Sequence, residues 1–128
     1  MFGKANQAFE YFSSSDAITC EATAPITGKT FVKLVAGGKA QRPKVVTAGA
    51  GDRPYGVASW DAATGESVTV IRVGIISVTA GEAIASGDAV AVGANGKAVK
   101  VGAAPAVAYG DVHEDTPINT DAAVALSI

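Results

Sequence analysis

The sequence has few of the residues on which catalysis and covalent stabilisation usually depend. It contains one cysteine, Cys20, and one histidine, His113. A single cysteine excludes an internal disulfide and predicts folding in a reducing cytoplasm. No second histidine or cysteine lies at ligand spacing from His113, and the adjacent Glu114 and Asp115 would point to opposite sides of a strand. We therefore expect no catalytic centre, no metal site and no cofactor, with Cys20 as a small buried apolar residue.

Long apolar runs are missing as well. Gly, polar or charged residues interrupt every apolar stretch, so none approaches the roughly 20 residues that cross a bilayer. The first residues also lack the apolar core of a signal peptide. Lys and Arg are not interleaved with aromatics, and Gly49-x-Gly51 is not followed by a helical pattern. We expect a soluble protein that binds neither membrane nor nucleic acid.

Leucine and aromatic residues are scarce, whereas small residues are abundant. Aromatics make up 6% of the chain and hydrophobic residues 48%, with 15 glycines and only two leucines, Leu34 and Leu126. A core must therefore be built from Val, Ile and Ala, which favours short strands joined by tight turns over a helical bundle. The composition predicts an all-β fold.

The pattern along the chain supports this fold class. From Ile18 onward, short alternating or apolar stretches are separated by Gly, Asn, Asp and Ser, as in strands and their turns. The stretch 73–92 has the pattern of two strands, with a turn at Gly81 and entry to the second strand through Gly87-Asp88. Asn95-Gly96 predicts a two-residue hairpin turn, because both residues tolerate positive φ.

Landmarks in the first half of the chain recur in the second. Val32-x-Leu34 matches Val90-x-Val92, and Tyr55-Gly56 matches Tyr109-Gly110; the full comparison also aligns Ile26 with Ile84, Lys44-Val45 with the Val99 strand, and Val68-x-Val70 with Val124-x-Leu126. We predict one all-β domain, residues 18–128, a small β-barrel or β-tulip-like module made of two degenerate β-meander repeats, about 18–74 and 75–128. Chance similarity in an Ala/Gly/Val-rich sequence is the alternative.

Residues 1–17 differ from the rest and are predicted to form an extended N-terminal arm. Four of the seven Phe and Tyr residues lie in the first twelve positions. Such an aromatic segment needs an apolar surface to pack against, either its own barrel or a neighbouring protein. The contact candidates are Phe2, Lys4, Phe9, Tyr11 and Phe12.

Charge is distributed unevenly. Residues 1–54 hold seven Lys and Arg against four Asp and Glu, whereas residues 55–128 hold three against eight. This polarity would let copies associate or dock onto an acidic surface, or it is an ordinary solvated surface. Trp60 is either an inter-subunit anchor or a cap over the core, with the cap favoured. The electrostatic and inter-subunit candidates are Lys29, Lys33, Lys39, Arg42, Lys44 and Trp60.

One carrier-like pattern is present. The order Gly81-Glu82 then Gly87-Asp88, with Lys97 after a tight turn, resembles the hairpins of biotinyl and lipoyl domains. The Met-Lys-Met or Asp-Lys-Ala context of those domains is missing. A biotinyl/lipoyl-like carrier or a small binding domain of a cellular complex is therefore the alternative function.

The order of turn landmarks resembles a further family. It runs from Tyr55-Gly56-Val57-Ala58 through Thr64-Gly65-Glu66, Val78-x-Ala80-Gly81 and Gly87-Asp88 to Gly96-Lys97. Over residues 20–128 this is similar to the capsid decoration, or cement, proteins of tailed bacteriophages. The resemblance implies a structural virion protein without an active site, made in the host cytoplasm and often trimeric. It implies binding outside the head at three-fold or quasi-three-fold positions, head stabilisation, and arms that contact the major capsid protein.

Overall fold

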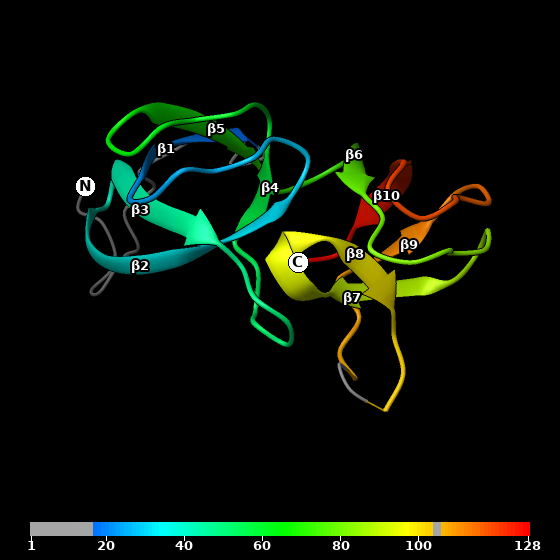
Figure 1. Cartoon of the computed structure of the whole chain (residues 1–128). Coiled ribbons are helices and arrows are strands. Elements are labelled where there is room, and N and C mark those ends of the chain that lie inside the picture. The colour runs from blue at the N-terminus through cyan, green and yellow to red at the C-terminus, as the bar shows by residue number, and fades with distance from the viewer. Residues whose placement is uncertain (1–16, 104–105) are drawn as a thin grey trace, which may run out of the picture.

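Ten strands form the framework of the computed structural model, which describes residues 17–103 and 106–128 (Figure 1). The first five are β1 (Ala17–Ala22), β2 (Phe31–Lys39), β3 (Arg42–Thr47), β4 (Gly56–Ala58) and β5 (Ser67–Ile71). The last five are β6 (Ile75–Thr79), β7 (Ala89–Val92), β8 (Ala98–Lys100), β9 (Gly110–Val112) and β10 (Asp121–Leu126). Within these ranges the only helical element is the short 3₁₀ turn η1 (Ala94–Gly96). The predicted all-β fold is confirmed.

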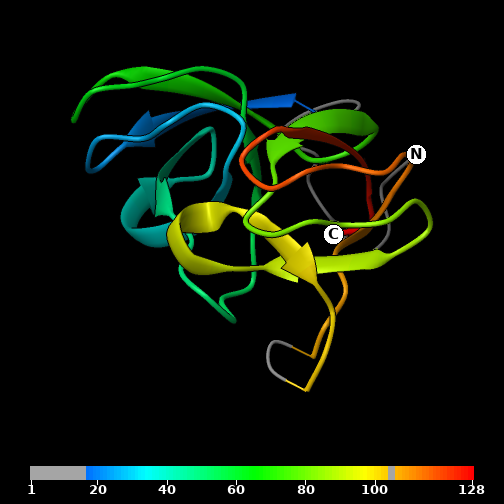
Figure 2. The same ribbon diagram turned by 45° about the vertical axis from the view of Figure 1, so that its right-hand side comes forward.

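The strands form two sheets that lie side by side. Strands β1 to β5 close into a barrel in the order β1-β3-β2-β4-β5. Strands β6 to β10 form a five-stranded sheet in the order β6-β10-β9-β7-β8. In Figure 2 the β7–β8 hairpin (yellow) lies in front, beside the first sheet. We refer to residues 17–74 as the first half and to residues 75–128 as the second half.

The predicted meanders are not what these sheets contain. In a meander each strand pairs with its neighbours in sequence, but here β2 lies between β3 and β4, and β1 pairs with β3 in parallel. That prediction was wrong in this respect. The spacing of turns shows where strands end, whereas strand order depends on contacts between residues far apart in the chain.

The two halves nevertheless use the same hydrogen-bond pattern. Val32 pairs with Gly56 between β2 and β4, and Val90 pairs with Gly110 between β7 and β9. The residue before each glycine donates its backbone N–H to the paired valine: Tyr55 to Val32 at 2.7 Å and Tyr109 to Val90 at 2.8 Å. The isolated bridges Ile26↔Ala62 and Ile84↔Thr116 also correspond. The structure thus repeats these pairings; the domain boundaries remain a proposal.

In two places, the hydrogen-bond register makes other residues correspond than the sequence comparison did. Val70 pairs with Ile18 in the first half, and its counterpart Val124 pairs with Ile76 in the second, so Val68-x-Val70 corresponds to Ala122-x-Val124. Likewise, Val45 opposite Leu34 corresponds to Ala98 opposite Val92, one residue before the aligned Val99. Alternation has a period of two, so an apolar pattern alone does not distinguish the first of these matches from one displaced by two residues.

Closure is where the halves differ. In the first half, Glu21↔Lys44 and Ala22↔Val45 join β1 to β3 and complete the barrel. In the second half, one isolated bridge makes the corresponding connection. It joins Ala80, the residue after β6, to Ala98 in β8. The segment 29–31 of the first half contacts both sides there: Thr79 donates its N–H to the Lys29 carbonyl at 2.8 Å, and a Cβ on Gly96 would lie 2.5 Å from the Phe31 carbonyl oxygen. The first half therefore helps to close the second.

The predicted Asn95-Gly96 turn explains how that close approach is possible. Asn95 has φ 59° and Gly96 has φ 70°, the positive values that a two-residue hairpin turn requires. The turn joins β7 to β8, with Val92 opposite Ala98. Gly96 is buried, and it is the residue whose missing side chain admits Phe31. The hairpin prediction is confirmed.

The core has two clusters built mainly from Val, Ile and Ala, as predicted. One lies within the first half and includes Ile18, Val45 and Val70. Cys20 belongs to this cluster and is fully buried, which confirms its predicted role. The second cluster contains second-half residues together with Phe31, Ala48 and Val57 of the first half. The core of the second half therefore includes three side chains of the first half.

Candidate functional site

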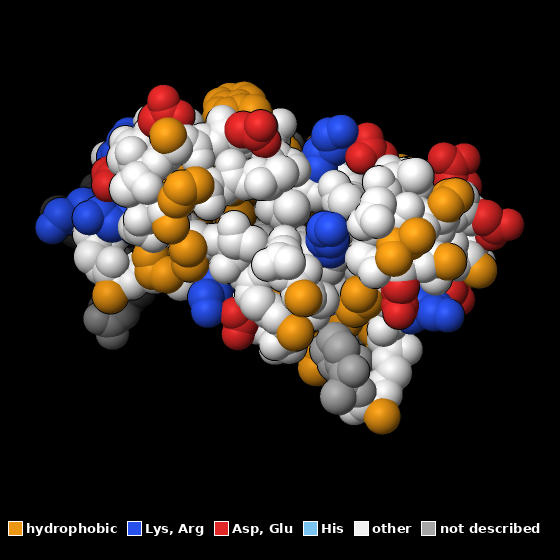
Figure 3. Space-filling model, in the orientation of Figure 1, with side chains coloured by type: hydrophobic (Ala, Val, Ile, Leu, Met, Phe, Trp, Pro, Cys, Tyr) orange, Lys and Arg blue, Asp and Glu red, His pale blue; other side chains and the backbone are white. Residues whose placement is uncertain are grey.

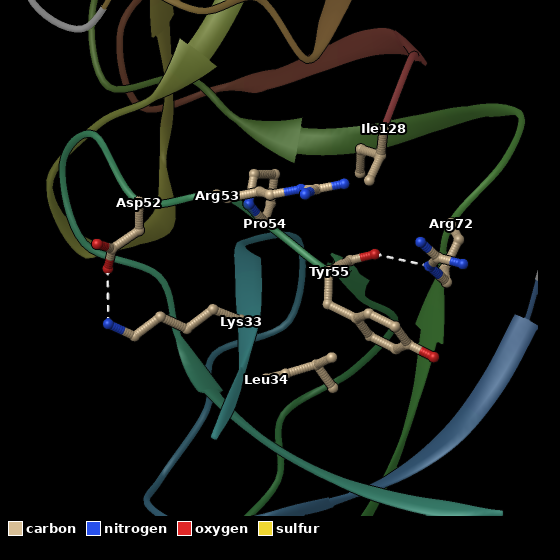
Figure 4. A pocket seen from close by; sticks show the side chains of 8 residues that line it. All are labelled: Lys33, Leu34, Asp52, Arg53, Pro54, Tyr55, Arg72 and Ile128. Atoms are coloured by element: carbon tan, nitrogen blue, oxygen red, sulfur yellow. Dashed lines mark hydrogen bonds and ion pairs between the residues drawn. The ribbon is translucent and has the colours of Figure 1, made fainter. Parts of the chain in front are cut away.

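A groove lined mainly by residues of the first half combines apolar and charged side chains. It consists of two adjoining hollows of about 440 and 480 Å³ that share Leu34 and Tyr55. Figure 4 shows the first hollow, with the Leu34 and Tyr55 side chains near each other and Arg72 beside the tyrosine. We call this surface the Leu34 groove. It is lined by Lys33 to Ala40, Pro43, Lys44, Asp52 to Tyr55, Arg72 and Ile128.

The groove follows from the way β2 leaves the barrel. Val32 points into the barrel and is fully buried. Leu34, two residues later, points to the same side of the strand but is 52% exposed. Its counterpart in the second half, Val92, is only 1% exposed. The same register position is thus open in one half and covered in the other.

Arg72 and Tyr55 contact each other in the groove. The Arg72 Nε donates to the Tyr55 carbonyl oxygen at 2.9 Å, and the guanidinium carbon lies 4.4 Å from the centre of the Tyr55 ring. Partial burial raises the pKa of the Tyr55 hydroxyl, while the Arg72 charge opposes that shift. The tyrosine is therefore neutral at physiological pH and offers an apolar ring with a polar tip.

Asp52 is the one carboxylate side chain that lines the groove. It accepts a hydrogen bond from Lys33 Nζ at 2.8 Å and another from the Gly49 N–H at 2.8 Å. The Lys33 bond, followed by the Gly49 bond, lowers the pKa of the Asp52 carboxyl. Arg53 and Lys39 also line the groove, and among the residues that the structure describes neither has a carboxylate partner. The surface is therefore cationic around an apolar floor.

The basic residues predicted from sequence are divided between this groove and other places. Lys33, Lys39 and Lys44 line it. Lys29 instead pairs with Asp121 across the two halves at 2.9 Å. Arg42 lies 3.4 Å from Glu21, to which Lys44 also approaches at 3.9 Å. Most of the predicted basic residues thus have carboxylate partners within the chain.

The sequence did not point to Leu34, Arg53, Tyr55 and Arg72 as one surface. These residues come from β2, the segment before β4 and the segment after β5, so only folding brings them together. Leu34 carried the one available signal, because it is one of only two leucines. The arm candidates Phe2, Lys4, Phe9, Tyr11 and Phe12 lie outside the described residues.

Trp60 does not cap the core. Its side chain is 52% exposed and belongs to neither buried cluster, and its indole N–H donates to the Ser67 carbonyl at 3.4 Å. The favoured cap interpretation was wrong, because the Trp60 side chain does not pack against either cluster. Its use as an inter-subunit anchor remains a proposal.

The residues with catalytic potential are used in structural roles. The His113 carbonyl accepts a hydrogen bond from Ser86 Oγ, and Asp115 accepts one from the Ser86 N–H. Both residues are exposed in the loop after β9. Burial raises the pKa of the Cys20 thiol to about 11, so it is protonated at neutral pH. Over residues 17–103 and 106–128, no three His, Cys, Asp or Glu side chains are grouped as metal ligands.

Lys97 is not presented as a carrier lysine would be. The turn that precedes it packs against Phe31 through Gly96, and Lys97 Nζ lies 3.3 Å from Asn119 Oδ1. The hairpin therefore does not project freely from the surface. No helix in the described part of the chain has both the length and the apolar character to cross a membrane.

Comparison with known proteins gives two positive findings. A family model described as "Phage cement protein" matches residues 13–128. Among solved structures, the chain is similar to the head fiber gp8.5 N base of bacteriophage phi29, with a TM-score of 0.73 and 21% sequence identity. That similarity covers 87% of this chain and 92% of the other, and at this identity it concerns the fold. No curated protein matches the chain.

Proposed function

Because the chain belongs to the phage cement protein family, we propose that it binds the outer surface of a phage head and stabilises the capsid lattice. It is a structural protein of the phage head. The observation that carries the proposal is the extent of the family match, which runs through both sheets of the molecule. The resemblance based on turn spacing agrees with it.

The proposed partners are the major capsid protein and further copies of this chain. We place a homotrimer at three-fold or quasi-three-fold positions of the shell, assembled from chains made in the host cytoplasm. A protein present in many copies gains avidity, so no single contact has to be tight. Stabilisation of this kind needs complementary surfaces and no active site.

Two parts of the chain are proposed to contact the shell or neighbouring copies. The first is the N-terminal arm, whose aromatics Phe2, Phe9, Tyr11 and Phe12 would supply apolar anchors, with Lys4 beside them. The second is the exposed surface of the domain, including Trp60. The arm is the better candidate for the shell, because interfaces favour aromatic residues.

Binding is tested with heads assembled without this protein. Purified chain is added, and bound protein is measured after the heads are sedimented. Heads that have bound the chain are expected to release their DNA at a higher temperature than undecorated heads, as followed with a DNA-binding dye. A chain that neither sediments with heads nor changes DNA release would show the proposal to be wrong.

The role of the arm is tested by deleting residues 2–12. The deletion is expected to leave the domain folded, since all ten strands lie beyond it, and to weaken sedimentation with heads. Circular dichroism and thermal unfolding of the truncated chain provide the folding control. Replacing the four arm aromatics with serine gives a matched variant of unchanged length. Undiminished binding by both variants would assign shell contact to the domain instead.

A further inference from the structure

The second half carries a surface of opposite character to the Leu34 groove. Two loops, residues 81–88 and 113–120, lie together at the far end of this half, at the right of Figure 1. The Ile84↔Thr116 bridge joins them, and the Ser86 N–H donates to Asp115 Oδ1 at 2.8 Å. We call this surface the acidic tip. Its carboxylates are Glu82, Asp88, Glu114 and Asp115.

None of these four carboxylates is ion-paired among the residues that the structure describes. Three of them accept backbone N–H groups instead: Glu82 from Lys100, Asp88 from Ala85 and Asp115 from Ser86. Those bonds hold the loops. Lys100 lines the same hollow as Asp88 and Asp115 without forming an ion pair with any described residue, so negative charge remains in excess at the tip. Figure 3 shows acidic side chains (red) at this end of the molecule, with basic surface (blue) beside them at its lower edge. Ile118, in the second of the two loops, is 54% exposed and adds an apolar group.

The Leu34 groove has the complementary properties. Lys39, Arg53 and Arg72 line it without carboxylate partners in the described part of the chain, and Leu34 forms an exposed apolar floor. The groove thus offers unpaired cations and an exposed leucine. The tip offers unpaired carboxylates and an exposed isoleucine, Ile118. Such complementarity favours association and sets its orientation.

The second half shows what becomes of the corresponding surface when a neighbour is present. Val92, the counterpart of Leu34, is buried beside first-half residues, and the Gly51 N–H donates to its carbonyl at 3.1 Å. This register position is thus covered by another half of the same kind. In the first half no described part of the chain covers it. A half from a second copy is the occupant that would complete the pattern.

We propose that the Leu34 groove of one copy binds the acidic tip of the next copy, so that chains associate head to tail. The contact uses two different surfaces, which lie on different halves, and is therefore heterologous: repetition with a closing rotation gives a ring. The inference deepens the proposed function, because it assigns the interface of the homotrimer proposed above. Ring formation does not depend on binding to heads, so the two can be tested separately.

The test is the association state of the full chain, measured by sedimentation velocity over a range of protein and salt concentrations. The wild-type chain is expected to form a closed oligomer that dissociates as salt rises, because exposed charges are screened. Reversing the groove (K39E/R53E) or the tip (E114K/D115K) is expected to weaken association by about tenfold or more, since like charges then face each other. The chain with all four changes is expected to recover association.

Matched variants separate the interface from general effects. E114K is compared with E66K, which changes the net charge by the same amount at an exposed residue outside both the groove and the tip, and which is expected to associate normally. L34S is compared with V73S, since both residues are exposed and apolar but only Leu34 lines the groove. L34S is expected to weaken association and V73S to leave it unchanged. Thermal unfolding of every variant confirms that the fold is retained.

Several outcomes would overturn the inference. A wild-type chain that remains monomeric at every concentration would do so, as would reversals of groove and tip that fail to rescue each other. If groove variants stay oligomeric but no longer bind heads, the groove receives an acidic segment of the shell instead. If the wild type binds a single-stranded oligonucleotide and R53E does not, the occupant is a nucleic acid. Loss of head binding by an oligomeric wild type would contradict the proposed function alone.

Discussion

The two halves of the molecule share their strand pairings but not the way in which they are closed. The first half closes into a barrel through its own β1 and β3. The second half has the same pairings elsewhere, but its β6 and β8 segments are joined by a single bridge. The segment 29–31 of the first half packs beside this bridge. Two halves with the same strand pairings can therefore differ in how far each relies on the other to close its sheet.

The cause lies in a few side chains. The cluster of the second half includes Phe31, Ala48 and Val57 from the first half, whereas the cluster of the first half includes no residue beyond Val70. Burial of apolar surface is the main stabilising contribution to a fold. The second half thus shares its core with first-half side chains, whereas the cluster around Ile18, Val45 and Val70 is built from first-half residues alone.

The strongest test of this asymmetry is to separate the halves. Residues 17–74 alone are expected to retain a folded barrel, while residues 75–128 alone are expected to lack stable tertiary structure, because they lose Phe31, Ala48 and Val57. Dispersion in proton–nitrogen NMR spectra of the two fragments distinguishes these states. Mixing the fragments is expected to restore the spectrum of the second. A second half that folds alone would remove the asymmetry.

Replacing Phe31 with alanine is the next largest effect. Phe31 is fully buried in the shared cluster, and such a truncation costs about 3–5 kcal/mol of unfolding free energy. Urea unfolding measures the loss, and hydrogen exchange is expected to increase most in β7 and β8. Leu34→Ala, on the same strand but exposed, is the control and is expected to change stability by less than about 0.5 kcal/mol. Uniform exchange throughout both sheets would contradict a specific role at the junction.

The equivalence of the halves is tested at a pair of corresponding glycines. A Cβ at Gly56 would lie 2.5 Å from Val70 Cγ1, and one at Gly110 would lie 2.6 Å from Val124 Cγ1. Gly56→Ala and Gly110→Ala are therefore each expected to cost about 1–3 kcal/mol through overpacking. Gly102→Ala, which meets no atom within 4 Å, is the neutral control. Costs that differ widely between Gly56 and Gly110 would show that the two sites are not equivalent.

These comparisons show which parts of the molecule its sequence could predict. Local signals were sufficient for the Asn95-Gly96 turn, for the valine-rich core and for burial of Cys20, because each depends on intrinsic preferences of the residues concerned. The resemblance to cement proteins, drawn from turn spacing, is confirmed by the family match.

The remaining features depend on contacts between distant residues. Strand order and the use of segment 29–31 to close the second half follow from packing of residues about 50 positions apart, such as Lys29 with Thr79. The Leu34 groove joins β2 and β3 to three further segments, at Asp52–Tyr55, Arg72 and Ile128. Nothing in the local pattern of Trp60 distinguished an exposed turn from a cap over the core. Long-range packing decides such positions, and a periodic pattern does not encode it.

A titratable group in one core but not the other provides a pH test. Cys20 occupies the position that Val78 has in the second half, and burial raises its pKa from 9.0 to about 11. A thiol whose folded pKa exceeds its unfolded value stabilises the fold fully below pH 9, and this contribution is lost as pH rises toward 11. Urea midpoints measured across this range are expected to fall for wild type and to change less for Cys20→Val. Equal slopes for both chains would exclude Cys20 as the cause.

The smallest expected effect concerns the ion pair between the halves. Lys29 and Asp121 lie 2.9 Å apart, and both side chains are about half exposed. A double-mutant cycle with Lys29→Met and Asp121→Asn is expected to give a coupling of about 0.2–1 kcal/mol, reduced by salt. The same cycle on Lys33 and Asp52, within the first half, is the matched control. A coupling well above this range for Lys29 and Asp121 would mean that electrostatics, rather than Phe31, holds the halves together.

The placement of segment 29–31 against the second sheet also bears on how the chain reaches its native state. A ribosome releases the first half before the second, and domains generally fold as their residues emerge. By then the closed barrel already displays the backbone that Thr79 and the Asn95-Gly96 turn will contact. The later strands thus meet a template, and their unpaired edges are covered soon after synthesis. Exposed edges promote aggregation, so this order of folding shields the second sheet soon after it forms.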